Sequence, residues 1–333
     1  MKNYTVSILI PTYNREDFIG ECIQSALDQT YADIEVIVVD NASTDGTWAI
    51  VQEMARLDAR VRAFQNVNNL GPVRNWRKCA EEARGEYSKI LFSDDLMAPD
   101  FIAHCLPLLQ DPDIAFVFTA AYIGDAMGRG TVGYQIGAKT KYSIDEYHDL
   151  LIRERMPFSP GAALFRTADI RKNLHDTLPT CRRHEFWRHG AGPDIMLYAL
   201  TALDYTAFAA IAEPLVLFRA HSRSISITNS NNEVLEGYRA ALSWYFSKRV
   251  STSLWYDYLV WQWTTEARLT MSWIDVEQFL TRYEGTGTRL ERIQFGAKAV
   301  LLIFSRTYRK LFRSRENMET LELSSDLGVL DKT

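Results

Sequence analysis

The sequence predicts an α/β fold, with a mostly parallel sheet flanked by helices and a helical C-terminal extension. In the first 120 residues, short apolar runs alternate with amphipathic segments, as strands alternate with helices. Strands that are separated by helices need crossover connections, and these connections favour parallel pairing. After about residue 230 the pattern is helical and rich in aromatic residues, which predicts the extension.

The predicted elements follow one another in this alternating order. The first apolar run, residues 6–10, predicts a buried strand that stops at Pro11. Asn14 is expected to cap the next helix, with Asp17 completing a capping box, because the apolar residues that follow recur at helical spacing. Further strands are expected at 34–39, 61–64, 89–92, 114–119, 162–166, 206–211 and 215–219, helices at 48–56, 72–84, 99–109 and 194–203, and a loop with one short helix at 120–158.

Composition and charge exclude several classes of protein. The 333 residues carry a formal net charge of −5, which argues against a nucleic-acid binder that neutralises many phosphates. The four cysteines are scattered without a CxxC pair, which favours free thiols in a reducing compartment. The first residues show no signal-peptide pattern, and no window has the ~18–20 apolar residues of a membrane span. We therefore expect a cytoplasmic protein.

Polar side chains follow three of the predicted strands. They lie in the segments Pro11-Thr12-Tyr13-Asn14, Asp40-Asn41-Ala42-Ser43 and Ser93-Asp94-Asp95. In an open parallel sheet the carboxyl ends of the strands meet at one edge, where ligands bind. Adjacent aspartates repel each other unless a cation or a proton separates them, and Mg²⁺ or Mn²⁺ held by carboxylates and substrate phosphates is the usual solution. The alternative is that these polar groups only cap helices.

Four segments carry a recognisable pattern in order and spacing: residues 11–14 (PTYN), 38–47 (VVDNASTDGT), 69–71 (NLG) with Arg74 and Asn75, and 91–95 (LFSDD). Together they resemble the family-2 glycosyltransferases. The resemblance covers residues 5–119 clearly and 159–224 more loosely. It implies the GT-A fold, a nucleotide-sugar donor and inversion at the anomeric carbon.

The resemblance assigns the nucleotide to residues that follow the first two strands. Tyr13, beside Pro11 and Thr12, would lie against the base, and Asp40 would accept a hydrogen bond from a uracil-like ring. A carboxylate suits the imide N–H of uracil or thymine, which favours a UDP or dTDP donor. The family often has a second acidic residue after this position, where the chain has Asn41.

The resemblance also implies groups that contact the diphosphate. Arg15 and Arg74 are candidates because a guanidinium presents planar donors to phosphate oxygens. Asp94 would touch the ribose, and Asp95 together with His221 would hold Mn²⁺ or Mg²⁺, although serine replaces the commonest first aspartate of the motif. Such a cation would offset the charge that develops on the departing diphosphate.

The acceptor hydroxyl needs a base, and the segment Gly192-Pro193-Asp194 resembles the acidic residue that serves this role in the family. An aspartate at the start of a helix is also a common N-cap, and the two roles are compatible. Glu185 and Asp204 are the alternative candidates for the base. A carboxylate is a weak base, so proton removal would accompany attack by the hydroxyl.

The C-terminal part carries an unusual density of positive charge. Between Arg289 and Arg315 there are eight basic residues and one acidic residue, around the apolar stretch 297–304. This pattern is typical of an interfacial helix drawn to anionic lipid on the inner face of the cell membrane, and a lipid-linked saccharide would then be a plausible acceptor. A packed helix with a solvated basic face is the alternative. The predicted division is a catalytic domain at 1–228, a helical region at 229–315 and a disordered tail at 316–333.

Two other functions remain open at this stage. A sugar nucleotidyltransferase shares the sheet and the metal, but it would usually carry a glycine-rich, basic loop after the first strand, where this chain has PTYN. A non-catalytic module that binds nucleotide sugars should have lost Asp94, Asp95 or Asp194, and the chain keeps all three. A dehydrogenase would need GxGxxG after a strand, and the sequence has none.

Overall fold

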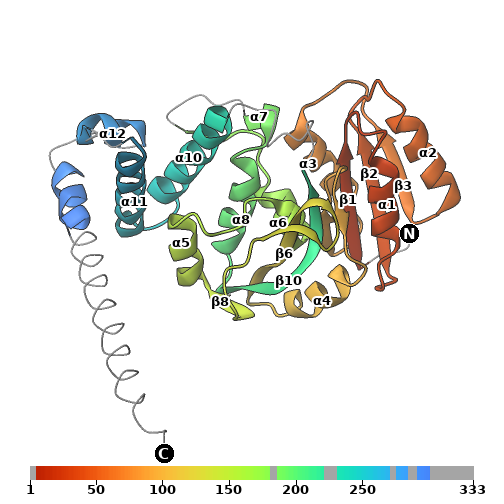
Figure 1. The fold of residues 1–333 in the computed structure, drawn as a ribbon, viewed down its shortest axis with the longest axis horizontal. Helices are drawn as coiled ribbons and strands as arrows, with labels where there is room; N and C mark the ends of the chain where they lie inside the picture. Colours follow the sequence, from red (N-terminus) through yellow and green to blue (C-terminus); the bar gives the residue numbers. More distant parts are fainter. Residues whose placement is uncertain (1–4, 181–185, 221–230, 271–274, 284–290, 301–333) are drawn as a thin grey trace, which may run out of the picture. The chain divides into compact units, whose positions relative to one another are not determined.

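The computed structural model describes residues 5–180, 186–220, 231–270, 275–283 and 291–300 (Figure 1). The chain divides into two compact units between Arg249 and Val250. The predicted boundary was at 228/229, whereas helix α10 (Asn231–Lys248) packs on α8 (Pro193–Ala202) inside the first unit. The predicted disordered tail, 316–333, lies outside the described residues.

The first unit is built on one sheet of ten strands within the described residues. The strand order is β3-β2-β1-β4-β9-β6-β10-β5, with β7 paired to β6 and β8 paired to β10. Strands β1 to β4 pair in parallel, and so do β6 and β10, while β9 is antiparallel to both of its neighbours. The strands are β1 Val6–Thr12, β2 Ile34–Asp40, β3 Val61–Gln65, β4 Tyr87–Ile90, β5 Leu96–Met97, β6 Ile114–Ala126, β7 Arg129–Gly133, β8 Lys141–Ser143, β9 Ala163–Arg166 and β10 Ala207–Arg219.

Helices cover both faces of this sheet, as the sequence predicts. On one face lie α1 (Ile19–Leu27), α2 (Thr47–Leu57) and α4 (Phe101–Leu109), and on the other lie α3 (Pro72–Glu82), α6 (Thr167–Asn173) and α8. Lys89 and Ser88 of β4 point to opposite faces, the first towards Phe101 of α4 and the second towards Thr167 of α6. The remaining elements of the unit are α5 (Ile144–Ile152), the 3₁₀ turn η1 (Pro160–Ala162) and α7 (Phe186–His189).

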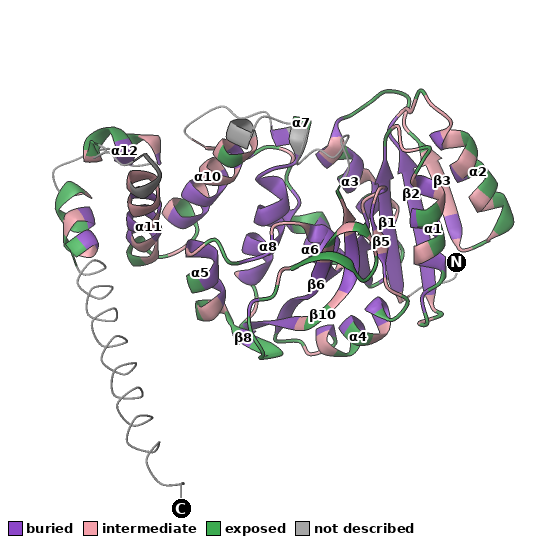
Figure 2. Cartoon of the chain, viewed as in Figure 1, coloured by how far each residue is buried: buried purple, intermediate pink, exposed green. Residues whose placement is uncertain are grey.

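Burial explains why β1 and β2 are almost continuous apolar runs. Every residue of both strands is buried (Figure 2). A parallel strand that is covered by helices on both faces needs apolar side chains in both directions, so alternation disappears. The amphipathic prediction for α1 is confirmed, because its buried residues are Ile19, Cys22, Ile23, Ala26 and Leu27.

The first strand is longer than predicted. It continues through Pro11 to Thr12, which pair with Val39 and Asp40 of β2. On the other side, β4 pairs only with Val6–Leu9. Proline lacks an N–H and is tolerated in a strand where the ladder has an open side, so Pro11 did not end the strand.

The predicted helix cap at Asn14 is wrong. Helix α1 begins at Ile19, and Phe18 at its N-cap makes no side-chain capping hydrogen bond. Asn14 has a φ of 51°, in the left-handed region that asparagine tolerates. Its side chain accepts the backbone N–H of Thr44 at 2.9 Å, so it joins two loops and caps no helix.

Two further segments differ from the prediction. The short helix predicted within 120–158 is confirmed as α5, but the rest of this stretch is not a loop, because it holds the end of β6, which forms a hairpin with β7, and strand β8. The separate strands predicted at 206–211 and 215–219 are one strand, β10, with irregular register around Pro214. Pairing with β6 over its length explains this continuity, which local pattern could not reveal.

The second unit contains α11 (Thr252–Thr270), α12 (Val276–Arg282) and a helical stretch at 291–300. Aromatic rings pack its interior, with Trp263 and Phe279 both against Phe295. Of the basic residues predicted to meet lipid, Arg292 pairs with Glu277 and Lys298 with Asp257, while the other six lie outside the described residues. No helix of the described part has the length and apolar character needed to cross a membrane.

Candidate functional site

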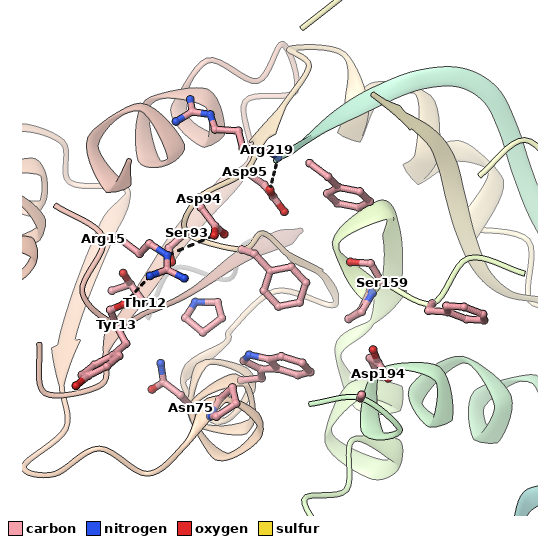
Figure 3. A pocket seen from close by; sticks show the side chains of 18 of the residues that line it. Thr12, Tyr13, Arg15, Asn75, Ser93, Asp94, Asp95, Ser159, Asp194 and Arg219 are labelled. Carbon is pink, nitrogen blue, oxygen red and sulfur yellow. Dashed lines mark hydrogen bonds and ion pairs between the residues drawn. The ribbon is translucent and has the colours of Figure 1, made fainter. Parts of the chain in front are cut away.

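A pocket of about 1200 Å³ opens at the carboxyl ends of the strands in the first unit. It has two parts, which we call the loop end (residues 11–13, 15, 41 and 93–95) and the Asp194 end (Tyr134, residues 158–160, Asp194 and Tyr238). In Figure 3, Arg15, Asp94 and Asp95 lie on one side of the pocket, and Ser159 and Asp194 lie on another. The predicted residues that line it are Pro11, Thr12, Tyr13, Arg15, Asn41, Asp94, Asp95 and Asp194.

Hydrogen bonds between the first two strand-end loops make the loop end rigid. The N–H of Asn14 donates to the Ser43 hydroxyl at 2.9 Å, and the N–H of Arg15 donates to the Thr47 hydroxyl at 2.7 Å. Together with the Asn14–Thr44 bond, these contacts fix the loop that follows β1 against the loop that follows β2. Tyr13 is left 41% exposed at the mouth of the pocket, where its ring is free to meet a ligand.

Asp40 does not line the pocket. It is fully buried beneath the loop end. Its Oδ2 accepts the N–H of Ser43 and the Gln65 side-chain amide, both at 3.0 Å, and its Oδ1 accepts the Ser43 hydroxyl. The next residue, Asn41, does line the pocket and bonds to the Asn69 side chain at 2.9 Å.

The two predicted arginines occupy different places. Arg15 lines the pocket and its Nε lies 3.3 Å from Oδ2 of Asp94. Arg74 is not part of the lining, and its Nε donates to Asp176 at 2.8 Å. His221, predicted as a metal ligand, lies outside the described residues.

The acidic pair of the loop end is arranged in a way that suits a cation. Asp95 is 7% exposed, and its Oδ1 accepts the backbone N–H of Arg219 at 3.0 Å. Burial and the neighbouring Asp94 carboxylate raise the pKa of Asp95 well above its usual range. A cation bound beside Asp95 would therefore stabilise the ionised form of this carboxyl group. The described residues hold no cluster of three or more potential metal ligands. Two adjacent carboxylates in a pocket fit an ion that also takes oxygens from substrate phosphates, and not an ion in a cage made only of protein.

Asp194 is the second helical residue of α8, after Gly192 and Pro193. Its Oδ1 accepts the backbone N–H groups of Gly192 at 2.8 Å and Ile195 at 2.7 Å, while its Oδ2 accepts the hydroxyl of Tyr238 at 2.6 Å. Burial raises the pKa of Asp194 to about 7, and these hydrogen bonds oppose the rise. A carboxyl group with a pKa near neutrality, in a pocket, is suited to accept a proton.

The alternative bases have weaker positions. Asp204 pairs with Lys172 at 2.6 Å on the surface and does not line the pocket. Glu185 lies outside the described residues.

Most of the aromatic lining of the pocket was not predicted from the sequence. Three pairs of rings contact each other around the pocket: Trp76 with Phe92 at 5.1 Å, Phe158 with Tyr238 at 4.9 Å, and Tyr134 with Phe218 at 5.6 Å between centroids. Phe92 lies inside the LFSDD segment and could have been found there. No local pattern distinguishes the other rings from core residues.

A glycine is required at position 190, directly after α7, where the backbone approaches the Trp76 ring. Gly190 has a φ of 77°, and a Cβ there would lie 2.5 Å from Cη2 of Trp76. Any larger residue would push the turn before α8, and with it Asp194, away from α3.

Comparisons with known proteins agree on one family. The model of the family described as "Glycosyl transferase family 2" matches residues 7–173 of this chain. Glycosyltransferase GlyG of Streptococcus pneumoniae serotype 4 is 32% identical over 117 residues, which are 35% of this chain and 39% of GlyG. Chondroitin synthase of Escherichia coli is 40% identical over 116 residues, 34% of this chain and 17% of the synthase. The matched region thus spans less than half of the length of these curated relatives.

Among solved structures, residues 1–349 of S. aureus TarS in complex with UDP-GlcNAc are similar to this chain, with a TM-score of 0.53 and 17% identity. The alignment covers 79% of this chain and 81% of that one. At this level of identity the likeness concerns the fold, and it confirms the predicted GT-A architecture.

Proposed function

This chain belongs to glycosyl transferase family 2, and from that premise we propose that it is an inverting glycosyltransferase, which moves a sugar from a UDP- or dTDP-linked donor onto a saccharide acceptor. One observation carries the proposal: a carboxylate pair suited to a cation and a buried carboxyl group suited to proton transfer line the same pocket. A transferase needs both, one for the leaving diphosphate and one for the attacking hydroxyl.

The proposed donor lies at the loop end. Tyr13 would face the base, Pro11, Thr12 and Asn41 would border it, and Arg15 and Asp94 would meet the ribose and the phosphates. The choice of UDP or dTDP depends on Asp40, whose Oδ1 accepts one hydrogen bond, from Ser43. A carboxylate oxygen can accept two, so Oδ1 retains an acceptor position for the imide N–H of uracil or thymine, which the base would reach only if the residues that cover the buried Asp40 moved. Arg74 would contribute only if it left Asp176.

Asp95, next to Asp94, would hold Mn²⁺ or Mg²⁺, and His221 remains a candidate ligand. When bound, the ion offsets negative charge on the departing diphosphate. Asp194 would accept the proton of the acceptor hydroxyl as this oxygen attacks the anomeric carbon from the side opposite the diphosphate, which inverts the configuration. Its two backbone N–H contacts hold the carboxylate in place for that transfer.

The proposed acceptor is a saccharide of cell-surface polysaccharide synthesis, with a lipid-linked saccharide as one form of it. The likeness to a bacterial chondroitin synthase supports a polysaccharide product. Contact between the basic C-terminal segment and anionic lipid at the inner face of the cell membrane belongs to the same proposal, with the cytoplasm as the compartment.

The test is donor turnover by the purified chain. UDP-glucose, UDP-GlcNAc, dTDP-glucose and GDP-mannose are each incubated with the protein and Mn²⁺, Mg²⁺ or EDTA, and the released nucleotide is identified. Metal-dependent release of UDP or dTDP supports the proposal. Release of pyrophosphate would instead identify a nucleotidyltransferase, and thermal stabilisation by a donor without any release would identify a binding module. Preference for GDP-mannose would refute the assignment of Asp40.

Asp194→Asn and Asp204→Asn form a matched pair for this assay. Both remove one carboxylate, but only Asp194 lines the pocket. The proposal requires that the first variant loses turnover and that the second keeps it.

A further inference from the structure

The proposed base does not stand alone: a tyrosine from a distant part of the chain is bonded to it. Tyr238 lies on α10, and its hydroxyl donates to Oδ2 of Asp194 at 2.6 Å. This helix comes after the residues that match the family description, which end at 173. Helix α10 packs directly on α8, which carries Asp194, so the two side chains are held by one helix pair.

The ring of Tyr238 also has a packing partner. It packs on Phe158 with 4.9 Å between the ring centroids, at an interplanar angle of 31°. Both rings line the pocket beside Asp194. The hydroxyl is therefore directed at the carboxylate by packing, and the bond does not depend on a freely rotating side chain.

The hydrogen bonds of Asp194 leave one defined place for a substrate hydroxyl. The two backbone N–H groups occupy Oδ1, and Tyr238 occupies one side of Oδ2. Each carboxylate oxygen accepts about two hydrogen bonds, so the remaining acceptor site is on Oδ2. The Asp194 side chain lines the pocket, where an acceptor would approach it.

We propose that Tyr238 is a positioning residue for the transfer reaction, which holds the Asp194 carboxylate in its ionised form and directs the remaining lone pair of Oδ2 towards the acceptor hydroxyl. This inference rests on the proposed function of Asp194 as the base. Tyr238 itself keeps its proton throughout, and the proton of the acceptor goes to Asp194.

Electrostatics explain why such a partner is needed. Burial is the main cause that raises the pKa of Asp194, and the Tyr238 hydrogen bond is the largest contribution that lowers it. The other titratable or charged groups that face this place in the described residues are Tyr134, Tyr198 of α8 and Arg188 of α7. Burial raises the pKa of both tyrosines, so they stay neutral near pH 7. Of Asp194 and the two tyrosines, only Asp194 should therefore titrate near neutral pH.

The test compares Tyr238→Phe with Tyr245→Phe. The first variant keeps the ring against Phe158 and removes only the hydroxyl that bonds Asp194. Tyr245 lies on the same helix, is fully buried and bonds His148 at 3.0 Å, away from the pocket lining. Each variant thus loses one hydrogen-bonded tyrosine hydroxyl from α10, but only one of them loses the contact with Asp194.

The primary measurement is a ¹³C NMR titration of the Asp194 carboxyl group, assigned with Asp194→Asn. We expect Tyr238→Phe to move the midpoint up by about one to two pH units, since a hydrogen bond to a charged group has about that strength. The acid limb of the pH profile of kcat/KM should move by the same amount, with turnover recovered at high pH. Tyr245→Phe should leave both unchanged.

An unchanged Asp194 midpoint in Tyr238→Phe would overturn the inference, and so would an equal loss of kcat/KM at every pH, which is what a purely structural role predicts. The NMR titration does not need turnover. If the midpoint moves as expected but the unmodified chain releases no nucleotide from any donor, the proposed function fails while the coupling of Tyr238 to Asp194 stands.

Discussion

The two ends of the pocket are assembled in different ways. At the loop end, the side chains come from the last two residues of β1 and from the short segments that follow β1, β2 and β4. At the Asp194 end, they come from Tyr134, Phe158, Asp194 and Tyr238, which lie in four elements or loops far apart along the chain. The comparison teaches that a local motif can mark one half of such a site, while the other half depends on how distant helices pack.

The largest effect is expected for Asp194→Asn, which removes the proposed base of the Asp194 end. Asparagine preserves an oxygen for the two backbone N–H groups but cannot accept the proton, so turnover should fall by about 10²- to 10⁴-fold. Steady-state release of nucleoside diphosphate measures this loss. If the turnover of Asp194→Asn stayed within threefold of that of the unmodified chain, Asp194 would not be the base.

The same variant also tests the burial of this carboxyl group. The pKa of Asp194 is raised in the folded chain, so its folded state binds more protons than the unfolded state between about pH 4 and pH 7. Stability from this group is present at low pH and is lost as pH rises to 7. Relative to the unmodified chain, Asp194→Asn should therefore gain up to about 4 kcal/mol in unfolding free energy between pH 4 and pH 8, measured by urea denaturation. A parallel pH dependence of both proteins would contradict this.

Lys89 is a buried residue beneath the pocket, and its titration should change the unfolding free energy by a similar amount. Its Nζ donates to the carbonyl oxygens of Ile90, in β4, and of Gly161, next to Pro160 of the pocket lining. Burial lowers the pKa of Lys89 to about 7, so the folded chain binds fewer protons than the unfolded chain between pH 7 and about 10. Unfolding free energy should rise with pH in this window, by up to about 4 kcal/mol.

Lys89→Met should remove this rise, because methionine fills the space without a titratable group. Urea denaturation at pH 7 and pH 9.5 measures the difference, and Lys172→Met on the surface serves as the control. If the unfolding free energy of Lys89→Met rises with pH as much as that of the unmodified chain, then Lys89 is charged in the folded protein.

At the loop end, Asp95→Asn should abolish the response to metal. Loss of one charge-stabilising group at a reaction centre reduces turnover by about 10²- to 10³-fold. Mn²⁺ should raise the melting temperature of the unmodified chain in the presence of UDP and should not raise that of the variant. Without metal, the variant should melt at the same or a higher temperature, because it no longer holds a buried carboxylate beside Asp94. Stabilisation of the variant by Mn²⁺ would place the ion elsewhere.

The smallest effect is expected for Gly190→Ala, which disturbs the packing of the Asp194 end. Its control is Gly128→Ala, since Gly128 has almost the same φ, 76°, but a methyl group added there would meet no atom of the described residues within 4 Å. Both variants carry backbone strain, and only Gly190→Ala also meets Trp76. We expect a loss of about 1–3 kcal/mol for Gly190→Ala and about 1 kcal/mol for Gly128→Ala in thermal or urea unfolding. Equal losses would show that Trp76 moves aside without cost.

The sequence predicted much of the first unit correctly. The strands near 34–39 and 61–64 and the helices near 48–56 and 72–84 lie where local pattern indicated, because each combines a buried face with clear boundaries. The errors have a common cause in tertiary contacts. Asn14 bonds the neighbouring loop and not a helix, and β6 extends to Ala126 because β7 and β10 pair with it.

By itself the sequence determined the α/β alternation, the acidic and polar loops after β1, β2 and β4, and Asp194 at the start of a helix. These features depend on residues that are neighbours in the chain. Only the tertiary structure decided that Asp40 lies beneath the pocket, that Arg74 turns to Asp176, and that Tyr238 reaches Asp194. Each of these contacts joins segments distant in sequence, or depends on which side of a strand faces the core, and packing of the whole unit decides both.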